Sequence, residues 1–482
     1  MSELEEADPV PDHPEHPAVT RDPFVTRVAR GVRDFVDGIA NSSPARLAVI
    51  VFVIVDLAFA ALLWLPVSAA PGKQTSVADA VFTATSAVTV TGLTTVSTAD
   101  QWSLFGQVII LVAIQIGGLG TLTMTSLLAL AIGRKLGLKS KLITQEALNI
   151  GRLGEVGSLL RIIVVTSISI EAALTVVLTL GFLVSGEPIH TALWHGVFYG
   201  ISSFNNAGFT PHSDGLVPYD HTGLDSWLIL FPICIGVFIG SLGFPVILVL
   251  REAGFRFTRW NLNAKLTLLT TGVLLVIGWL LFSSFEWDNQ ATIGEKPVSE
   301  RIFHGFFASV MMRSGGFNLV DMTDTSPVTL LLTDALMFVG GGSASTAGGI
   351  KVTTLAVVFL AILAEARGDK SVIAFFRTIP DSVLRISISV IMMGATVVLT
   401  GSAILVGLTG RPLDHVLFEV ISAYATCGLS VGVSADATDA GKYVLAIIML
   451  IGRIGTNTVA TALALRSRRR LYSYPEERPI IG

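Results

Sequence analysis

The sequence predicts an all-α membrane protein that is built from four similar modules arranged around a central pore. Three observations lead to this prediction. Hydrophobic residues make up 51% of the 482 residues and charged residues only 14%, against about 25% charged residues in soluble domains. Eight apolar stretches are long enough to cross a bilayer. One short sequence pattern occurs four times, each time between two of these stretches.

The apolar stretches define the expected helices, because a span requires about 20 apolar residues. In chain order, the candidate spans are Ala45–Leu65, Leu104–Ile132, Leu160–Val184, Leu224–Leu250, Leu266–Phe285, Val328–Ala364, Ile386–Leu408 and Tyr443–Leu465. Each successive pair of spans encloses a shorter apolar stretch of about 10–14 residues, which is typical of a re-entrant half-helix. Each module is therefore expected to consist of a span, a half-helix, a loop and a second span.

Each half-helix contains one copy of the repeated pattern. Every copy places a Phe ten positions before a Gly, and the four pairs are Phe82 and Gly92, Phe198 and Gly208, Phe306 and Gly316, and Phe418 and Gly428. A Ser stands six positions before the Gly in three copies, whereas the third copy has Val310. The glycines are spaced by 116, 108 and 112 residues, which indicates a fused array of whole modules and not a solenoid.

The repeat also divides the chain. We expect a cytosolic N-terminal tail over 1–44, module 1 over 45–135, module 2 over 136–257, module 3 over 258–368, and module 4 with the C-terminal tail over 369–482. Basic residues cluster before the first span and after the second, fourth, sixth and eighth spans. The positive-inside rule therefore predicts that both termini are cytoplasmic and that the half-helices enter from outside. The basic clusters could also bind lipid or a cytosolic subunit.

Glycine loops at membrane depth point to an ion pathway. Non-helical backbone is tolerated there only when it is buried or lines water. The C-terminal end of a half-helix is partly negative and favours a cation, and loop carbonyls can replace the hydration shell of a monovalent cation. The residues expected to bind the ion are Thr91, Gly92, Ala207, Gly208, Gly315, Gly316, Cys427 and Gly428. A single membrane glycine more often serves helix packing, but four copies in register favour the ion pathway.

Two further segments interrupt the apolar pattern. The sixth span contains the run GGGSASTAGGIK, which consists of Gly340, Gly341, Gly342, Ser343, Ala344, Ser345, Thr346, Ala347, Gly348, Gly349, Ile350 and Lys351. Breaking a helix at this depth requires a water-lined cavity, although a packing kink is the alternative. Arg453 lies inside the eighth span, where a buried charge costs at least about 2.5–3.5 kcal/mol and should face a cavity or a partner. Snorkelling to the lipid headgroups is the alternative for Arg453.

Other acidic residues also lie within apolar segments. Asp56, Glu171 and Asp334 could attract cations or could pair with polar groups between helices. Glu419 is expected to interact with the dipole at the start of the fourth half-helix. The chain shows no HExxH motif, nucleophile motif or metal-ligand cluster that would indicate an enzyme.

These motifs resemble the Trk/Ktr/HKT superfamily of potassium transporters from about Ala45 to Gly482. The resemblance implies four fused M1–pore–M2 modules, with selectivity-filter glycines at Gly92, Gly208, Gly316 and Gly428. In the plant branch of that superfamily, Ser at the first filter position goes with sodium selectivity, so Gly92 implies potassium. The resemblance also implies an intramembrane gating loop at Gly340–Lys351 that interacts with Arg453. The family pattern often has Pro where this chain has Thr456.

The resemblance is strongest to the membrane subunit of bacterial Ktr systems. It implies potassium uptake across the bacterial plasma membrane, a homodimer, and a cytosolic nucleotide-binding regulatory ring of the RCK type. Sodium remains open as an activator or a coupled ion. We expect membrane lipids as neighbours, no organic cofactor in this chain and no nucleic-acid partner. The alternatives are a sodium-permeable member of the superfamily and a secondary transporter coupled to sodium or protons.

Overall fold

The structure is a computed structural model that describes residues 44–135, 156–221 and 223–455, with side chains over 49–120, 161–221 and 223–455. The chain divides into Met1–Leu47 and a compact unit, Ala48–Gly482, and the description below concerns the second unit. Several predictions lie outside the described residues. They are the tail over 1–43, the basic residues of that tail and of 136–155, the eighth span beyond residue 455, Thr456 and the C-terminal tail.

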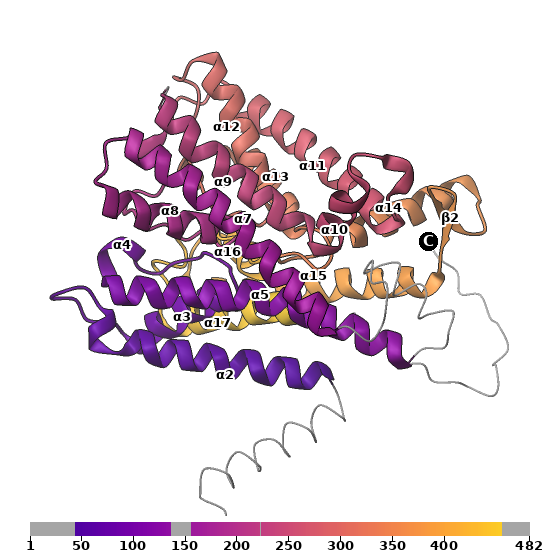
Figure 1. Cartoon of the computed structure of the whole chain (residues 1–482), viewed down its shortest axis with the longest axis horizontal. Coiled ribbons are helices and arrows are strands. Elements are labelled where there is room, and N and C mark those ends of the chain that lie inside the picture. The colour runs from indigo at the N-terminus through magenta and orange to yellow at the C-terminus, as the bar shows by residue number, and fades with distance from the viewer. Residues whose placement is uncertain (1–43, 136–155, 222, 456–482) are drawn as a thin grey trace, which may run out of the picture. The chain divides into compact units, whose positions relative to one another are not determined.

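The described residues are mostly helical (Figure 1). The helices outside the repeated pattern include α2 (Pro44–Trp64), α5 (Leu104–Lys135), α7 (Val156–Val184), α9 (Leu224–Leu242), α10 (Phe244–Ala253), α11 (Leu262–Glu286), α13 (Pro327–Phe338), α14 (Val352–Arg367), α15 (Asp381–Thr409) and α17 (Asp439–Leu450). In the described part of the chain, four helical segments are long and apolar enough to cross a membrane: Arg161–Val184, Leu224–Leu242, Leu262–Glu286 and Asp381–Thr409.

Four helices of 12–16 residues carry the repeated pattern. They are α3 (Val77–Val88), α8 (Ile189–Phe204), α12 (Val298–Met311) and α16 (Leu413–Ala425). Ser76 caps α3 by accepting a hydrogen bond from the Asp79 amide, while a proline occupies the N-cap position of the other three helices. Both residue types suit a helix start, because Ser satisfies an unpaired amide and Pro has none to satisfy.

Two of the predicted spans are broken. The sixth span consists of α13 and α14, which are separated by the non-helical segment 339–351, where the sequence predicted an interruption. The fourth candidate span, Leu224–Leu250, contains a break that was not predicted. The helix stops at Gly243, where φ is +89°, and restarts as α10. Pro245 stands in the first turn of α10, where its missing amide proton does not matter.

The core consists of several apolar clusters that join elements distant in the sequence. The first helices and the last described helix lie together, because α17 contacts α3 (indigo and yellow in Figure 1). One cluster combines Phe82 and Leu93 with Phe418 and Leu445. Another combines Phe198 and Ala207 with Ile110. A two-stranded antiparallel hairpin, β1 (Val372–Ala374) and β2 (Arg377–Ile379), follows α14.

Minor elements complete the fold. They are the short helix α4 (Thr98–Gln101), the 3-10 turns η1 (Pro66–Ser68), η2 (Val217–Tyr219), η3 (Phe257–Arg259) and η4 (Met322–Asp324), and the π-helical turn η5 (Ile451–Gly455). The turn η5 follows α17 directly and contains Arg453. Single π-turns often occur at functional positions in helices.

Candidate functional site

The four repeat glycines lie against one another in a closed order. A methyl group built on Gly92 would collide with the Ala207 carbonyl oxygen and lie 3.2 Å from the Gly208 Cα. One built on Gly208 would lie 3.0 Å from the Gly316 Cα. One on Gly316 would collide with the Cys427 carbonyl oxygen, and one on Gly428 would collide with the Thr91 carbonyl oxygen. The last contact returns to the first loop, so the four loops form a ring.

The backbone conformation repeats around this ring. Each repeat glycine has a positive φ, between +67° and +97°. The residue two positions earlier also has a positive φ, and these residues are Val90, Asn206, Ser314 and Thr426. L-residues rarely adopt this conformation, which costs about 1–2 kcal/mol for a non-glycine residue. Such strain persists only when the surrounding structure enforces it, and it concentrates at functional sites.

The Ser of the repeat holds the loop onto its helix. The Gly92 amide donates to the Ser86 hydroxyl at 3.1 Å, and the Gly428 amide donates to the Ser422 hydroxyl at the same distance. In the second copy, the Ser202 hydroxyl donates to the Phe209 carbonyl at 2.8 Å. The third copy has no such hydroxyl, and its Gly316 amide instead faces the Met311 carbonyl at 3.4 Å. The third loop therefore lacks the contact with a Ser hydroxyl that the other three loops have, because Val310 replaces the Ser.

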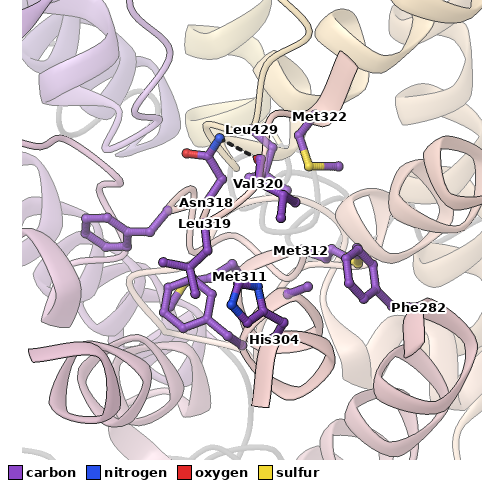
Figure 2. Close-up of a pocket in the computed structure, with 12 residues that line it drawn as sticks. Phe282, His304, Met311, Met312, Asn318, Leu319, Val320, Met322 and Leu429 are labelled. Atoms are coloured by element: carbon purple, nitrogen blue, oxygen red, sulfur yellow. Dashed lines mark hydrogen bonds between the residues drawn. The ribbon is translucent and has the colours of Figure 1, made fainter. Parts of the chain in front are cut away.

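The third loop packs against apolar side chains that include two methionines. A cavity of about 20 Å³ is lined by residues that include Met311, Met312 and Phe282. Figure 2 shows the side chains that line it, and the Asn318 amide donates to the Val320 carbonyl at 3.0 Å. A cavity of this size holds about one water molecule, so it is not a ligand site. Methionine side chains adapt to irregular gaps. They can therefore pack against the third loop, which has Val310 where the other three copies have Ser.

A wider cavity opens on one side of the ring. Its volume is about 450 Å³, and all four repeat glycines line it together with the loops that follow them. The lining is mainly polar and includes Thr94, Thr210, Asp214 and Ser430. We call this cavity the vestibule.

The segment 339–351 lies against the other side of the ring, at the residues two positions before the glycines. The Thr346 hydroxyl donates to the Asn206 side chain at 2.8 Å. The Gly348 amide donates to the Ser314 hydroxyl at 3.1 Å. A methyl group on Gly348 would collide with the Thr426 hydroxyl. The segment therefore contacts three of the four loops.

The break at Gly243 receives the same segment. The Gly342 amide donates to the Ser241 carbonyl at 2.7 Å, and the Phe244 amide donates to the Ala344 carbonyl at 2.9 Å. A methyl group on Gly243 would collide with the Ser343 carbonyl oxygen. The two helix breaks thus satisfy each other's freed backbone groups, which a low-dielectric interior requires.

Two basic side chains bind the segment. Arg453 is 2% exposed, and its guanidinium donates to the Thr346 carbonyl. The Lys351 ammonium donates to the Ala347 carbonyl at 2.6 Å. The structure therefore brings together Arg453, the segment 340–351 and the glycine loops. The positive charges lie on the side of the ring away from the vestibule.

Two of the buried acids bind polar groups in the protein, whereas the Oδ1 of a third, Asp334, has no hydrogen-bond partner among the described residues. Asp56 accepts a hydrogen bond from Thr85 at 3.0 Å, and Glu171 accepts hydrogen bonds from Gln115 and Asn205 at 3.0–3.1 Å. Glu419 does not serve the dipole of its helix, so that prediction is wrong. Its carboxylate accepts hydrogen bonds from the amides of Val431 and Ser434 and thereby fixes the loop that follows Gly428.

The loop that follows Gly208 contains two titratable groups with shifted pKa values, Asp220 and His212. Burial acts to raise the pKa of Asp220, but hydrogen bonds from His304 and Lys296, both at 2.6 Å, outweigh burial and hold this pKa below its usual value of 3.8. Burial, and then the neighbouring His195, lower the pKa of His212 to about 4. His212 lines the vestibule and is therefore neutral at neutral pH.

Two features of the site have little signal in the sequence. Gly243 lies within an apolar stretch, and only the GFP sequence, with a proline two positions after the glycine, signals a break. Glu187, His195 and His212 lie close together, but their sequence separations match no ligand motif.

Comparisons with known proteins show the family of the chain. The family model described as TrkH, cation transport protein, matches residues 39–470. The chain is 36% identical to the Ktr system potassium uptake protein B of Vibrio alginolyticus, over 92% of this chain and 96% of that protein. It is 34% identical to the potassium/sodium uptake protein NtpJ of Enterococcus hirae, over 91% and 97%.

A solved structure has the same fold. The crystal structure of the potassium transporter TrkH from Vibrio parahaemolyticus superimposes with a TM-score of 0.67, covers 88% of this chain and 84% of that chain, and shares 18% sequence identity. At this identity the match concerns the fold alone. Since the family model matches most of the chain and the relatives match over nearly their whole length, the chain belongs to the TrkH family of cation transport proteins.

Proposed function

We propose that this protein takes up potassium across the cell membrane through the ring of four glycine loops. The observation that carries the proposal is the closed contact order of Gly92, Gly208, Gly316 and Gly428, with the carbonyls of Thr91, Ala207 and Cys427 at the junctions. Backbone carbonyls at such a constriction can replace the water around a monovalent cation. The names of the relatives support potassium as that cation.

The proposed architecture is four M1–pore-loop–M2 modules in a pseudo-fourfold arrangement. The second helices of modules 2 and 3 would each be one broken span, α9 with α10 and α13 with α14. The helices α3, α8, α12 and α16 would be re-entrant and would end at the ring. In this arrangement the module boundaries are those expected from the sequence, the vestibule faces outward and both termini are cytoplasmic.

We propose that the segment 340–351 is the gate. Three glycine loops contact it, so an ion that leaves the ring must pass it. Arg453 and Lys351 bind its carbonyls, and their positive charge opposes the passage of a cation in a low-dielectric pathway. Displacement of the segment, together with the release of Arg453, would open the path.

The proposed assembly is a homodimer that binds a separate cytosolic regulatory ring of the RCK type. The term "Ktr system" in the names of the relatives supports a system of more than one protein. Potassium is the transported ion and is not a resident cofactor. Sodium is proposed as an activator or coupled ion.

Rubidium uptake into proteoliposomes tests the function. The purified chain, together with its regulatory partner, should take up radioactive rubidium without any organic substrate. Gly208→Ala should abolish uptake, because its methyl group would lie 3.0 Å from the Gly316 Cα at a residue with positive φ. Gly407→Ala is the matched control, because nothing lies within 4 Å of its added methyl group. Absence of uptake by the folded wild-type complex would sink the proposal.

A sodium-permeable pathway is the second candidate. One relative is named a potassium/sodium uptake protein. Competition separates the two candidates, because excess sodium should displace rubidium only when the ring accepts both ions. We expect less competition from sodium than from potassium, since Gly92 occupies the first loop.

A further inference from the structure

A cluster of metal-ligating side chains lies beside the vestibule. The ligand atoms of Glu187, His195 and His212 all lie within 4.8 Å of one another. These residues come from three places: the turn before α8, the second turn of α8, and the loop four residues after Gly208. Their side chains are 13–19% exposed, so the cluster is enclosed but reachable.

Glu187 is the centre of the cluster. Its Oε2 lies 2.7 Å from the His195 Nδ1, and its Oε1 lies 3.6 Å from the His212 Nε2. Tetrahedral zinc, with bonds of about 2.0–2.2 Å to nitrogen and oxygen, requires ligand atoms about 3.3–3.5 Å apart. A metal ion in place of the hydrogen between His195 and Glu187 therefore needs only small adjustments of side chains.

Two tyrosines surround these residues as a supporting shell. The Tyr219 hydroxyl donates to Glu187 Oε1 at 2.8 Å and lies 3.1 Å from the His212 Nε2. The Tyr199 hydroxyl lies 2.8 Å from the other ring nitrogen of His212, Nδ1. The Phe182 ring packs against both histidines and both tyrosines. Hydrogen bonds to the second nitrogen of a histidine fix its orientation and tautomer at metal sites.

Hydrogen bonds account for only part of this arrangement. Glu187 is hydrogen-bonded to His195 at 2.7 Å and to Tyr219 at 2.8 Å, but its Oε1 lies 3.6 Å from the His212 Nε2, which is longer than a normal hydrogen bond. Two neutral imidazole nitrogens and one carboxylate oxygen are the ligand set of open zinc sites, in which water takes the fourth position. Imidazole ligands disfavour magnesium, calcium and alkali cations, which prefer oxygen ligands alone.

We propose that Glu187, His195 and His212 bind a borderline divalent metal ion of the zinc type at the wall of the vestibule. The bound ion joins the start of α8 to the loop that follows Gly208. His212 belongs to the lining of the vestibule, so the metal ion reaches the site from that cavity. An occupied site places a divalent charge beside the cation entrance and restrains the second glycine loop.

We expect a bound metal ion at this site to lower the rate at which cations enter the vestibule. This consequence rests on the proposed transport function, whereas metal binding itself does not. Like charges near the entrance lower the local concentration of cations. We therefore expect zinc on the vestibule side to lower rubidium uptake at least twofold in the wild type.

Calorimetric titration of zinc chloride into the purified full chain in detergent tests binding directly. We expect the wild type to bind one zinc ion per chain. Each of Glu187→Gln, His195→Gln and His212→Gln should bind zinc at least about 100-fold more weakly. Tyr219→Phe removes a supporting hydrogen bond and should weaken binding about tenfold. The melting temperature of each variant without zinc checks its folding.

His221→Gln is the matched control. His221 lies in the same outer loop region and pairs with Asp225 at 2.9 Å, outside the cluster. Its substitution should leave both zinc binding and zinc inhibition unchanged. Zinc binding that is absent in the wild type up to 1 mM, or that survives in folded Glu187→Gln and His212→Gln, overturns the site. If the wild type binds zinc but its rubidium uptake does not change when zinc is added, the proposed effect on cation entry is overturned and the metal site itself stands.

Discussion

At the residue scale, the ring depends on the absence of four side chains. Each repeat glycine combines a positive φ with a neighbouring loop that occupies the place of its Cβ. The neighbouring loop belongs to a different module every time. A substitution at one glycine therefore deforms two loops, and its effect on ion binding should exceed its effect on folding.

Gly92→Ser tests this argument. The added Cβ would collide with the Ala207 carbonyl oxygen, so this carbonyl must move and the ring must widen or lose a ligand. We expect the preference for rubidium over sodium to fall at least about tenfold, which corresponds to about 1.4 kcal/mol. The measurement is uptake of both ions into proteoliposomes. Gly407→Ser should behave as the wild type, and unchanged selectivity in Gly92→Ser would remove the role assigned to this residue.

Asp220 provides a test of pH dependence. The folded state favours its carboxylate form, since its pKa lies below 3.8. Its contribution to stability is therefore present above about pH 4 and is lost as the pH falls through the lowered pKa. We expect Asp220→Asn to cost about 1.5 kcal/mol at pH 7, and this difference from the wild type should shrink as the pH falls below about 4.

Thermal unfolding in detergent at several pH values provides the measurement. Asp436→Asn is the control, because the Asp436–Arg411 pair is largely exposed and exposed pairs contribute little. A stability difference between wild type and Asp220→Asn that does not change between pH 7 and pH 3 would contradict the assignment.

At the element scale, the sequence indicated the helices well and the contacts between them poorly. Apolar length and the Phe-to-Gly spacing predicted where α3, α8, α12 and α16 lie. Apolar length did not predict the break at Gly243, because the hydropathy of a residue does not depend on the sign of its φ angle. The cluster around Glu187 was also missed, since its ligands meet only when the loop after Gly208 folds back onto α8.

Arg453→Gln tests the role of the gate. Removing the guanidinium charge and its bond to the Thr346 carbonyl should lower the barrier and release the segment. We expect rubidium uptake without the regulatory partner to rise at least about fivefold. Arg411→Gln is the control, because Arg411 lies at an exposed surface.

Deletion of Gly342–Gly348 should act in the same direction as Arg453→Gln. It removes the contacts to Asn206 and Ser314 together with the segment. A deletion variant that folds but transports nothing, even with the partner present, would count against a gate in this segment.

At the scale of the whole molecule, the proposed topology exposes the vestibule to the outside of the cell and the region beyond α14 to the cytoplasm. Ser213 lies exposed at the vestibule, and Lys370 lies exposed beyond α14. Both native cysteines are buried, so introduced cysteines report their own positions. We expect an impermeant maleimide to label Ser213→Cys in intact cells and Lys370→Cys only after permeabilisation. Labelling of both from outside would contradict the orientation.

The mutual docking of the two helix breaks has a consequence for the energetics of opening. The segment 340–351 is tied to α9 and α10 through the Ser241 carbonyl and the Phe244 amide, and to the loops through Asn206 and Ser314. Each of these bonds contributes about 0.5–1.5 kcal/mol net, so leaving all four costs about 2–6 kcal/mol. The open conformation would then be populated at about 3% or less at rest. A regulatory partner must therefore bind the open conformation at least about 30-fold more tightly to make it the major species.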